Sequence, residues 1–114
     1  MLTASVTLAT AGSYLIFASV RLDFNVATFN SPESATLKLR ETANGPADLA
    51  NAVRVLNTGS PTAESETFFA GEIPPVIYAA QAGDVIQIFG SLSDTPYTGS
   101  VDAIEASILA IKLF

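Results

Sequence analysis

One stretch, Gly12 to Phe24 (GSYLIFASVRLDF), constrains the possible folds of this chain more than any other. After its first glycine it contains neither Pro nor Gly, so nothing in it interrupts an extended strand. Alternate residues of a strand share a face, and one such set is apolar throughout: Tyr14, Ile16, Ala18, Val20, Leu22 and Phe24. The other set is apolar first and polar afterwards: Leu15, Phe17, Ser19, Arg21 and Asp23. A strand of a small domain normally buries one face and exposes the other to water. We therefore expect something other than water to cover Leu15 and Phe17.

Composition narrows the class of protein. The chain has 114 residues, near the usual size of one domain, and we expect a single domain over residues 1–114. Hydrophobic residues make up 49% of it and charged residues only 14%, which favours a buried core over disorder. The net charge of −6 argues against binding to nucleic-acid phosphates or to an anionic membrane surface.

Two missing residue types exclude several kinds of chemistry. Without cysteine there are no disulfides, no thiol catalysis and no cysteine–zinc site. Without histidine there is no imidazole base and no histidine-ligated metal. No apolar run approaches the roughly 18 residues of a membrane span, and the start, MLTASVTLAT, lacks the basic region of a signal peptide. We therefore expect a complete protein made inside the cell, with export by an unmarked route left open.

Alternation and turn residues predict about eight short strands. They cover residues 2–8, 12–24, 35–40, 49–56, 63–70, 76–80, 85–90 and 101–114. Turns are predicted at 43–48, 57–62 and 81–84, and Pro74-Pro75 is expected to separate two strands. The last segment is also compatible with a helix, since Ile104, Ile108 and Ile111 have helical spacing. Because its residues also alternate, we predict a central strand that is apolar on both faces, and hence an all-β antiparallel sandwich.

Three motifs occur in order along the chain. The first is a Gly-x-Tyr-x-hydrophobic-aromatic strand, Gly12-Ser13-Tyr14-Leu15-Ile16-Phe17. The second is a Gly-Asp turn within residues 79–86, AAQAGDVI, and the third is the closing apolar segment at residues 107–114, SILAIKLF. Together they resemble the corresponding motifs of the tumour necrosis factor and complement globular-head superfamily. The match covers roughly residues 6–114.

The resemblance implies a jelly-roll sandwich that assembles as a homotrimer, with the first and last motifs side by side in the inner sheet. The positions that match the family's subunit interface are Leu15, Phe17, Tyr78, Ile108 and Phe114. Tyr14 and Ile16 match core positions. Lys112 departs from the pattern, because an apolar residue is expected on the presumed interface; it would extend to the rim or pair with an acidic neighbour.

Acidic side chains are the main candidates for a metal or catalytic site. A calcium site would use Asp84, Asp94, Asp102 and Glu105. Their spacing is not that of an EF-hand loop, so solvated loop carboxylates are the favoured interpretation, and no metal or cofactor is expected. Glu64 and Glu66 share one face of a predicted edge strand, which favours a charge that prevents edge pairing over a glycosidase pair.

Other candidates have equally plain interpretations. Ser60 and Ser107 lack a histidine partner, so no nucleophilic catalysis is expected and the protein is interpreted as a non-enzyme. Gly83-Asp84 is interpreted as a turn rather than a ligand site. Four aromatic residues in or beside loops either anchor a partner or cover the ends of the sandwich: Phe29, Phe68, Phe69 and Tyr97.

The resemblance also carries the functional expectation. A trimer without a stalk is similar to the versions found on bacteriophage particles, so we expect a capsid decoration (cement) protein. It would be made in the host cytoplasm and would bind the major capsid protein on the outer surface of a phage head. The alternative is a trimeric receptor-binding head at a fibre tip, recognising a host glycan or protein. A sugar-binding or hydrolytic jelly roll is a third interpretation, which the absence of His and Trp disfavours.

Overall fold

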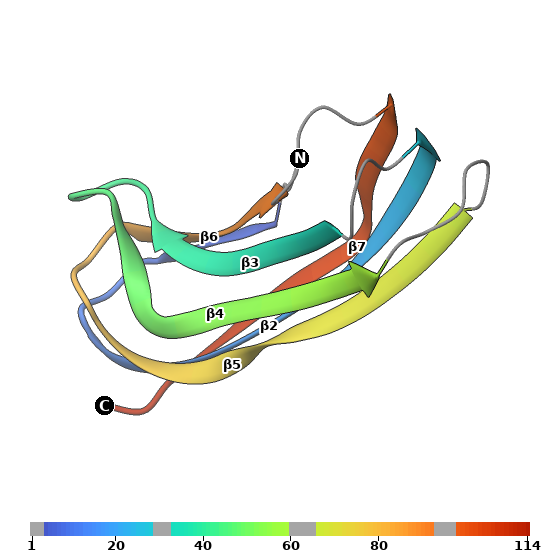
Figure 1. Ribbon diagram of the computed structural model, residues 1–114. Coiled ribbons are helices and arrows are strands. Elements are labelled where there is room, and N and C mark those ends of the chain that lie inside the picture. The colour runs from blue at the N-terminus through green and yellow to red at the C-terminus, as the bar shows by residue number, and fades with distance from the viewer. Residues whose placement is uncertain (1–3, 29–32, 60–65, 93–97) are drawn as a thin grey trace.

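The computed structural model describes residues 4–28, 33–59, 66–92 and 98–114, and this part of the chain contains seven strands and no α-helix (Figure 1). The strands are β1 (Ser5–Leu8), β2 (Gly12–Thr28), β3 (Glu33–Glu41), β4 (Ala47–Gly59), β5 (Glu66–Ala80), β6 (Asp84–Leu92) and β7 (Thr98–Lys112). No helix among these residues is long and apolar enough to cross a membrane.

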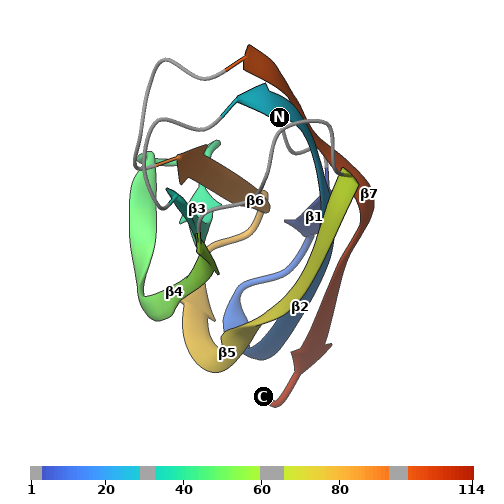
Figure 2. The same cartoon turned by 45° about the vertical axis from the view of Figure 1, so that its right-hand side comes forward.

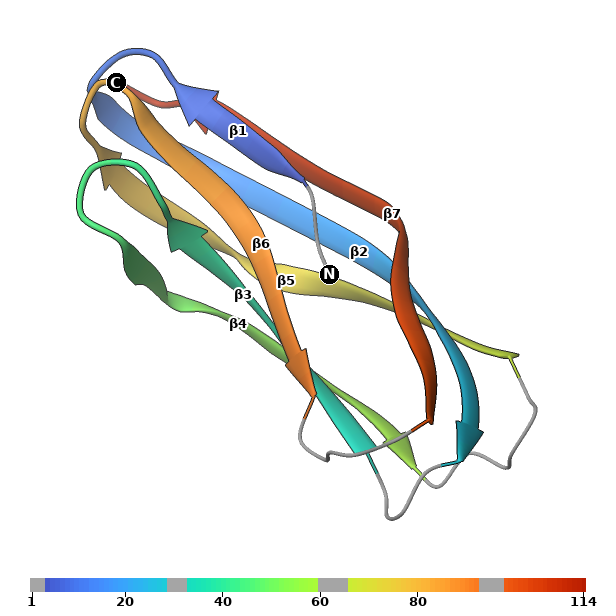
Figure 3. The same cartoon turned by 90° about the horizontal axis from the view of Figure 1, so that it is seen from above.

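The strands form two antiparallel sheets packed as layers. One sheet has the order β1-β6-β3-β4 and the other the order β5-β2-β7. Figures 2 and 3 show the layers from two directions, with β4 close to β5 and β1 close to β7. β3 is followed by β4 in the same sheet, whereas β1, β2, β4, β5 and β6 are each followed by a strand of the opposite sheet. The predicted all-β antiparallel sandwich is confirmed.

The core lies between the sheets and is supplied by alternate residues of each strand. Its largest fully buried side chains are Ile16, Leu37, Leu39, Ile73, Ile86 and Ile88. Burying a side chain of this size stabilises a fold by about 1.5–3 kcal/mol, so these residues dominate the favourable free energy of packing. Leu37 and Leu39 alternate with Lys38 and Arg40 as predicted, because β3 exposes its other face to solvent.

The opening stretch forms most of β2, the middle strand of the three-stranded sheet. Of its predicted inward residues, Tyr14, Ile16, Ala18 and Val20 are buried. The strand continues to Thr28, past the predicted end at Phe24. The extension continues because Asn25 pairs with both β5 and β7, and Val26 and Thr28 pair with β7, which local turn propensity does not reveal.

The prediction that Pro74-Pro75 separates two strands is wrong. β5 runs continuously from Glu66 to Ala80, and its pairing with β2 shifts at the prolines: Ile16 pairs with Val76, but Ala18 pairs with Ile73. Two prolines therefore oppose the single residue Phe17, as in a β-bulge. Proline is tolerated there because β5 is an edge strand. The merger reduces the expected eight strands to the seven described.

The last segment is a strand, as predicted, and β7 pairs with β2 along most of its length. Its central position is a wrong prediction, because β7 lies at the edge of the sheet. Composition suggested a central strand because both faces are apolar near the end of β7. The inner face packs on the core, whereas Leu109 and Ile111 lie on the outer face.

Gly12 is required where the chain enters β2. Its φ of +153° is one that other residues rarely adopt. The C-terminal residues also pass close by, since Ser13 N–H donates to Phe114 O at 2.8 Å and Leu113 N–H donates to Ser13 O at 2.8 Å. A Cβ at position 12 would lie 2.6 Å from the Phe114 carbonyl oxygen.

We expect Gly12→Ala to destabilise the protein by more than about 1 kcal/mol, because it adds a backbone clash to an unfavourable φ. Urea unfolding measures this loss. Gly45→Ala is the matched control: Gly45 also has a positive φ, +127°, but apart from its two chain neighbours no residue has an atom within 4 Å of an added Cβ. Equal losses in the two variants would mean that contact with the C-terminus is unimportant.

Candidate functional site

The most distinctive surface is the outer face of the β5-β2-β7 sheet. Its apolar part, here called the outer apolar face, consists of Leu15, Phe17, Ile77, Leu109 and Ile111. Leu15 pairs with Ile77 on one side and Ile111 on the other, and Phe17 pairs with Leu109, so the five share one surface. Ile77 is 70% exposed, Leu109 58% and Phe17 39%. A contiguous exposed apolar patch of this kind usually marks an interaction site.

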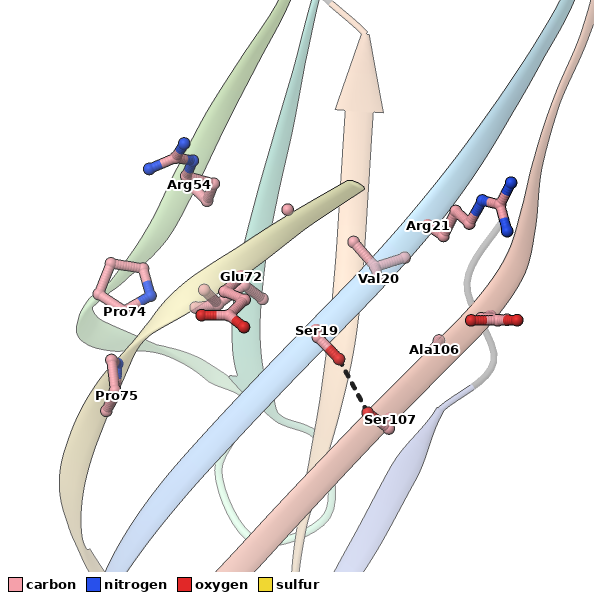
Figure 4. A pocket seen from close by; sticks show the side chains of 12 residues that line it. Ser19, Val20, Arg21, Arg54, Glu72, Pro74, Pro75, Ala106 and Ser107 are labelled. Atoms are coloured by element: carbon pink, nitrogen blue, oxygen red, sulfur yellow. Dashed lines mark hydrogen bonds between the residues drawn. The ribbon is translucent and has the colours of Figure 1, made fainter. Parts of the chain in front are cut away.

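The same sheet face becomes polar beyond Phe17. Ser19 and Ser107 are opposite each other, and their hydroxyl oxygens are 2.9 Å apart in a hydrogen bond (Figure 4). Glu72 of β5 pairs with Ser19 on the other side. The next pair is Arg21 and Glu105, of opposite charge. Charge is thus confined to one end of the sheet face.

A groove of about 720 Å³ lies at this polar end, on the side where β4 approaches β5. Figure 4 shows Arg54 of β4 near Pro74, with Glu72 and the two serines beyond it. The two serines of the groove bond to each other, and the chain has no histidine that could act as an imidazole base toward them.

The five predicted interface residues do not lie on one surface. Leu15 and Phe17 are on the outer face, and Phe114, at the chain end, is 85% exposed. Tyr78 and Ile108 instead pack against the core. The reason is register: Tyr78 pairs with Tyr14 and Ile108 with Ala18, and directly paired residues share a face.

The outer-face residues that sequence reasoning missed are therefore Ile77, Leu109 and Ile111. Their orientation follows from the strand register, because Ile77 and Ile111 pair with Leu15 and Leu109 pairs with Phe17. The sequence does not reveal that register. Lys112 pairs with Tyr14, so it has the inward phase and is exposed because the strand ends there. The expected conflict of a lysine on the outer apolar face does not arise.

A second cluster lies at one end of the sandwich and consists of Glu41, Asn44, Tyr78 and Asp84; we call it the carboxylate clamp. Glu41 is 4% exposed and Asp84 2% exposed. Buried carboxylates require hydrogen-bond donors, and both have them. The Glu41 carboxylate accepts bonds from the N–H groups of Ala43 (2.7 Å), Asn44 (2.6 Å) and Val85 (3.0 Å).

Asp84 links three segments of the chain. Its Oδ1 accepts a bond from Asn44 Nδ2 at 2.9 Å, in the loop between β3 and β4. Its Oδ2 accepts bonds from the Tyr78 hydroxyl at 2.7 Å and from Gln81 N–H at 3.0 Å. Gly83, with a φ of +89°, allows the tight turn. The interpretation of Gly83-Asp84 as a turn is confirmed.

Hydrogen bonding holds these carboxylates in the ionised form. Burial raises the pKa of Glu41, but the bonds from Ala43, Val85 and Asn44 outweigh it and leave the pKa below its ordinary 4.5. The bonds from Asn44 and Tyr78 lower the pKa of Asp84 below its ordinary 3.8, against the effect of burial. Burial and the bond to Asp84 raise the pKa of Tyr78, so its hydroxyl is a donor at neutral pH.

Most of the other candidate residues have side chains that the structure does not describe. Asp94, Glu64, Ser60, Phe29 and Tyr97 are outside the described residues. Four further candidates lie in strands, but their side chains are not described: Asp102, Glu66, Phe68 and Phe69. Among the residues that are described, no group of three or more acidic side chains is arranged to hold a metal ion. Asp84 serves as a structural hydrogen-bond acceptor.

Comparison of the sequence with models of known protein families gives no match. Comparison with curated protein sequences gives none either. The function is therefore inferred from the outer apolar face, the groove and the clamp.

We expect the carboxylate clamp to make the free energy of unfolding depend on pH in the acidic range. Because the pKa values of Glu41 and Asp84 are lower in the folded state than in the unfolded state, their contribution is complete above the ordinary values of 4.5 and 3.8. It is lost as the pH falls from there through the lowered folded values. Urea unfolding from pH 7 to about pH 2 should show this loss, and Asp84→Asn should flatten it while lowering stability at pH 7.

Two tyrosine variants separate the clamp from general packing. Tyr78→Phe removes a donor to Asp84 and should weaken the acid dependence. Tyr14→Phe removes a hydroxyl that donates instead to Thr10 O at 2.8 Å, so it should lower stability without changing the acid dependence. An unchanged acid dependence in Tyr78→Phe would contradict the assignment.

Proposed function

We propose that this protein is a non-enzymatic structural module that forms a homotrimer through its outer apolar face and decorates a phage capsid. The observation that carries the proposal is the exposure of Phe17, Ile77, Leu109 and Ile111 on one sheet face, around the half-buried Leu15. These positions include Leu15 and Phe17, which the sequence alone predicted to be covered by something other than water.

A second copy of the chain is the occupant that fits the uncharged character of the outer apolar face. Two copies each carry −6 and repel each other, and this repulsion is weakest when the surfaces that meet carry no charge of their own. The outer apolar face contains no charged side chain, and charge begins only at Glu72, Arg21 and Glu105. Interface cores are depleted of charge in the same way, with polar groups at the rim.

A threefold ring requires contact between two different surfaces, because each subunit meets its neighbours head to tail. A second exposed apolar pair, Val53 and Val55, is available on β4 in the other sheet. A trimer of net charge −18, three times −6, would remain soluble and would not stack on other trimers.

The capsid role rests on symmetry and on the resemblance to globular heads. A trimer fits the threefold positions of an icosahedral shell, where three weak contacts act together and add to avidity. In this proposal the partner is the major capsid protein, and the protein is located on the outer surface of the virion. Its buried carboxylates are engaged in structural hydrogen bonds, which supports a role without catalysis.

Phe17→Ala should dissociate the trimer. Losing a central aromatic contact typically weakens an interface by about 2 kcal/mol, roughly thirtyfold in dissociation constant. Light scattering should give a mass of three chains for the wild type and a shift toward one chain for the variant. Phe89→Ala is the matched control, because Phe89 is 38% exposed on the other sheet, where it contacts Arg40. A monomeric wild type, or equal effects of the two variants, would contradict the proposed interface.

Co-sedimentation tests the capsid role. The purified protein should pellet with phage heads lacking it, at a fixed ratio to the major capsid protein, and should increase their resistance to heat. Glycan binding without capsid binding would instead favour the receptor-binding alternative. Because oligomeric state is measured separately, failure here would leave the trimer proposal intact.

A further inference from the structure

Asn44 occupies a chemically vulnerable position in the carboxylate clamp. Its side-chain amide donates to Asp84 Oδ1 at 2.9 Å and to Ala82 O at 3.4 Å, joining the β3–β4 loop to the β5–β6 turn. Its backbone N–H donates to Glu41 at 2.6 Å. The residue is nevertheless exposed to water, and the next residue is Gly45.

Asparagine is a thermolabile residue, and a following glycine favours its breakdown. Glycine has no side chain to hinder attack by its backbone nitrogen on the asparagine side chain. Here the surroundings are open as well, because apart from the chain neighbours Asn44 and Pro46 no residue has an atom within 4 Å of the position that a Gly45 Cβ would occupy. The flexible backbone of glycine also helps the loop to reach the geometry of attack.

We propose that Asn44 is a site of spontaneous deamidation that disables the carboxylate clamp as the protein ages. The Gly45 nitrogen loses its proton to solvent and bonds to Cγ of Asn44. The bond from Cγ to Nδ2 breaks, and that nitrogen takes up a proton from solvent and leaves as ammonia. Water then opens the resulting succinimide ring at either carbonyl, leaving aspartate or isoaspartate at position 44.

Deamidation replaces a hydrogen-bond donor at position 44 with a carboxylate, which only accepts hydrogen bonds. A carboxylate cannot donate to Asp84, so the link between the loop and the turn is lost. It also places a negative charge beside the carboxylates of Asp84 and Glu41, which repel it. Isoaspartate in addition lengthens the backbone within the loop and displaces the N–H groups that bind Glu41.

The clamp lies beside the outer apolar face, which makes the consequence larger. Tyr78 of the clamp directly follows Ile77 of that face, and Tyr78 pairs with Tyr14 beside Leu15. Loss of the clamp would therefore release the end of β5 that carries part of the face. Deamidation itself does not depend on the proposed function.

Peptide mapping by mass spectrometry tests the modification directly. Wild-type protein is incubated at neutral to mildly alkaline pH and sampled over time, with isoaspartate detected by enzymatic methylation. Asn44 should convert several times faster than Asn51, an exposed asparagine of β4 that is followed by alanine. Conversion at Asn44 no faster than at Asn51 would overturn the proposal.

A genetic substitution tests the consequence. Asn44→Asp reproduces one product and should lower the thermal midpoint of unfolding at neutral pH. Asn51→Asp is the matched control, with the same change in charge at an exposed residue that makes none of the clamp's hydrogen bonds, and should have a smaller effect. If both variants unfold at the wild-type midpoint, deamidation does not disable the clamp. If Asn44→Asp fails to fold, a falling midpoint of the ageing wild type provides the same measurement.

Discussion

The pairing of β2 with a strand on each side is the constraint on which the rest of the structure depends. Because β2 is the middle strand of its sheet, the alternation of its side chains determines which residues lie on each of the two faces of that sheet. Tyr14, Ile16 and Ala18 enter the core, and Leu15 and Phe17 face outward. A slip of one residue would exchange these sets and place Ser19 and Arg21 in the core. Fold and surface are therefore fixed by the same register.

Two local features hold that register. At the start of β2, Gly12 permits the close approach of the C-terminal residues. In its middle, the two prolines of β5 oppose Phe17 alone, and the pairing resumes with Ile73 against Ala18. Ile73 and Val76 both lie on the inner face although they are three residues apart, which a regular strand does not allow. The bulge restores the apolar phase of β5 after the prolines.

Sequence alone predicted what depends on local alternation, and missed what depends on pairing. The inward set of β2, the strand nature of the last segment and the turn at Gly83-Asp84 all follow from neighbouring residues. The continuity of β5 does not, because proline lowers strand propensity unless the strand is known to be at an edge. The orientation of Tyr78 and Ile108 toward the core does not follow from local sequence either, because it is set by partners some sixty and ninety residues away in the chain. The carboxylate clamp could not be predicted from the sequence, because Glu41 and Asp84 lie far apart in the chain and come together only in the folded protein.

The position of the clamp bears on how an interface could form on the adjoining sheet. Burying a surface costs conformational entropy for every side chain and segment that must become ordered, so a rigid surface binds more tightly than a loose one of equal area. The apolar end of the β5-β2-β7 sheet is braced by Tyr78, Asp84 and the C-terminal bonds to Ser13. The other end carries Glu72, whose burial would require a partner for its charge. Rigidity and low desolvation cost therefore coincide at Leu15, Ile77 and Ile111, which are the residues of this sheet face best suited to the proposed contact.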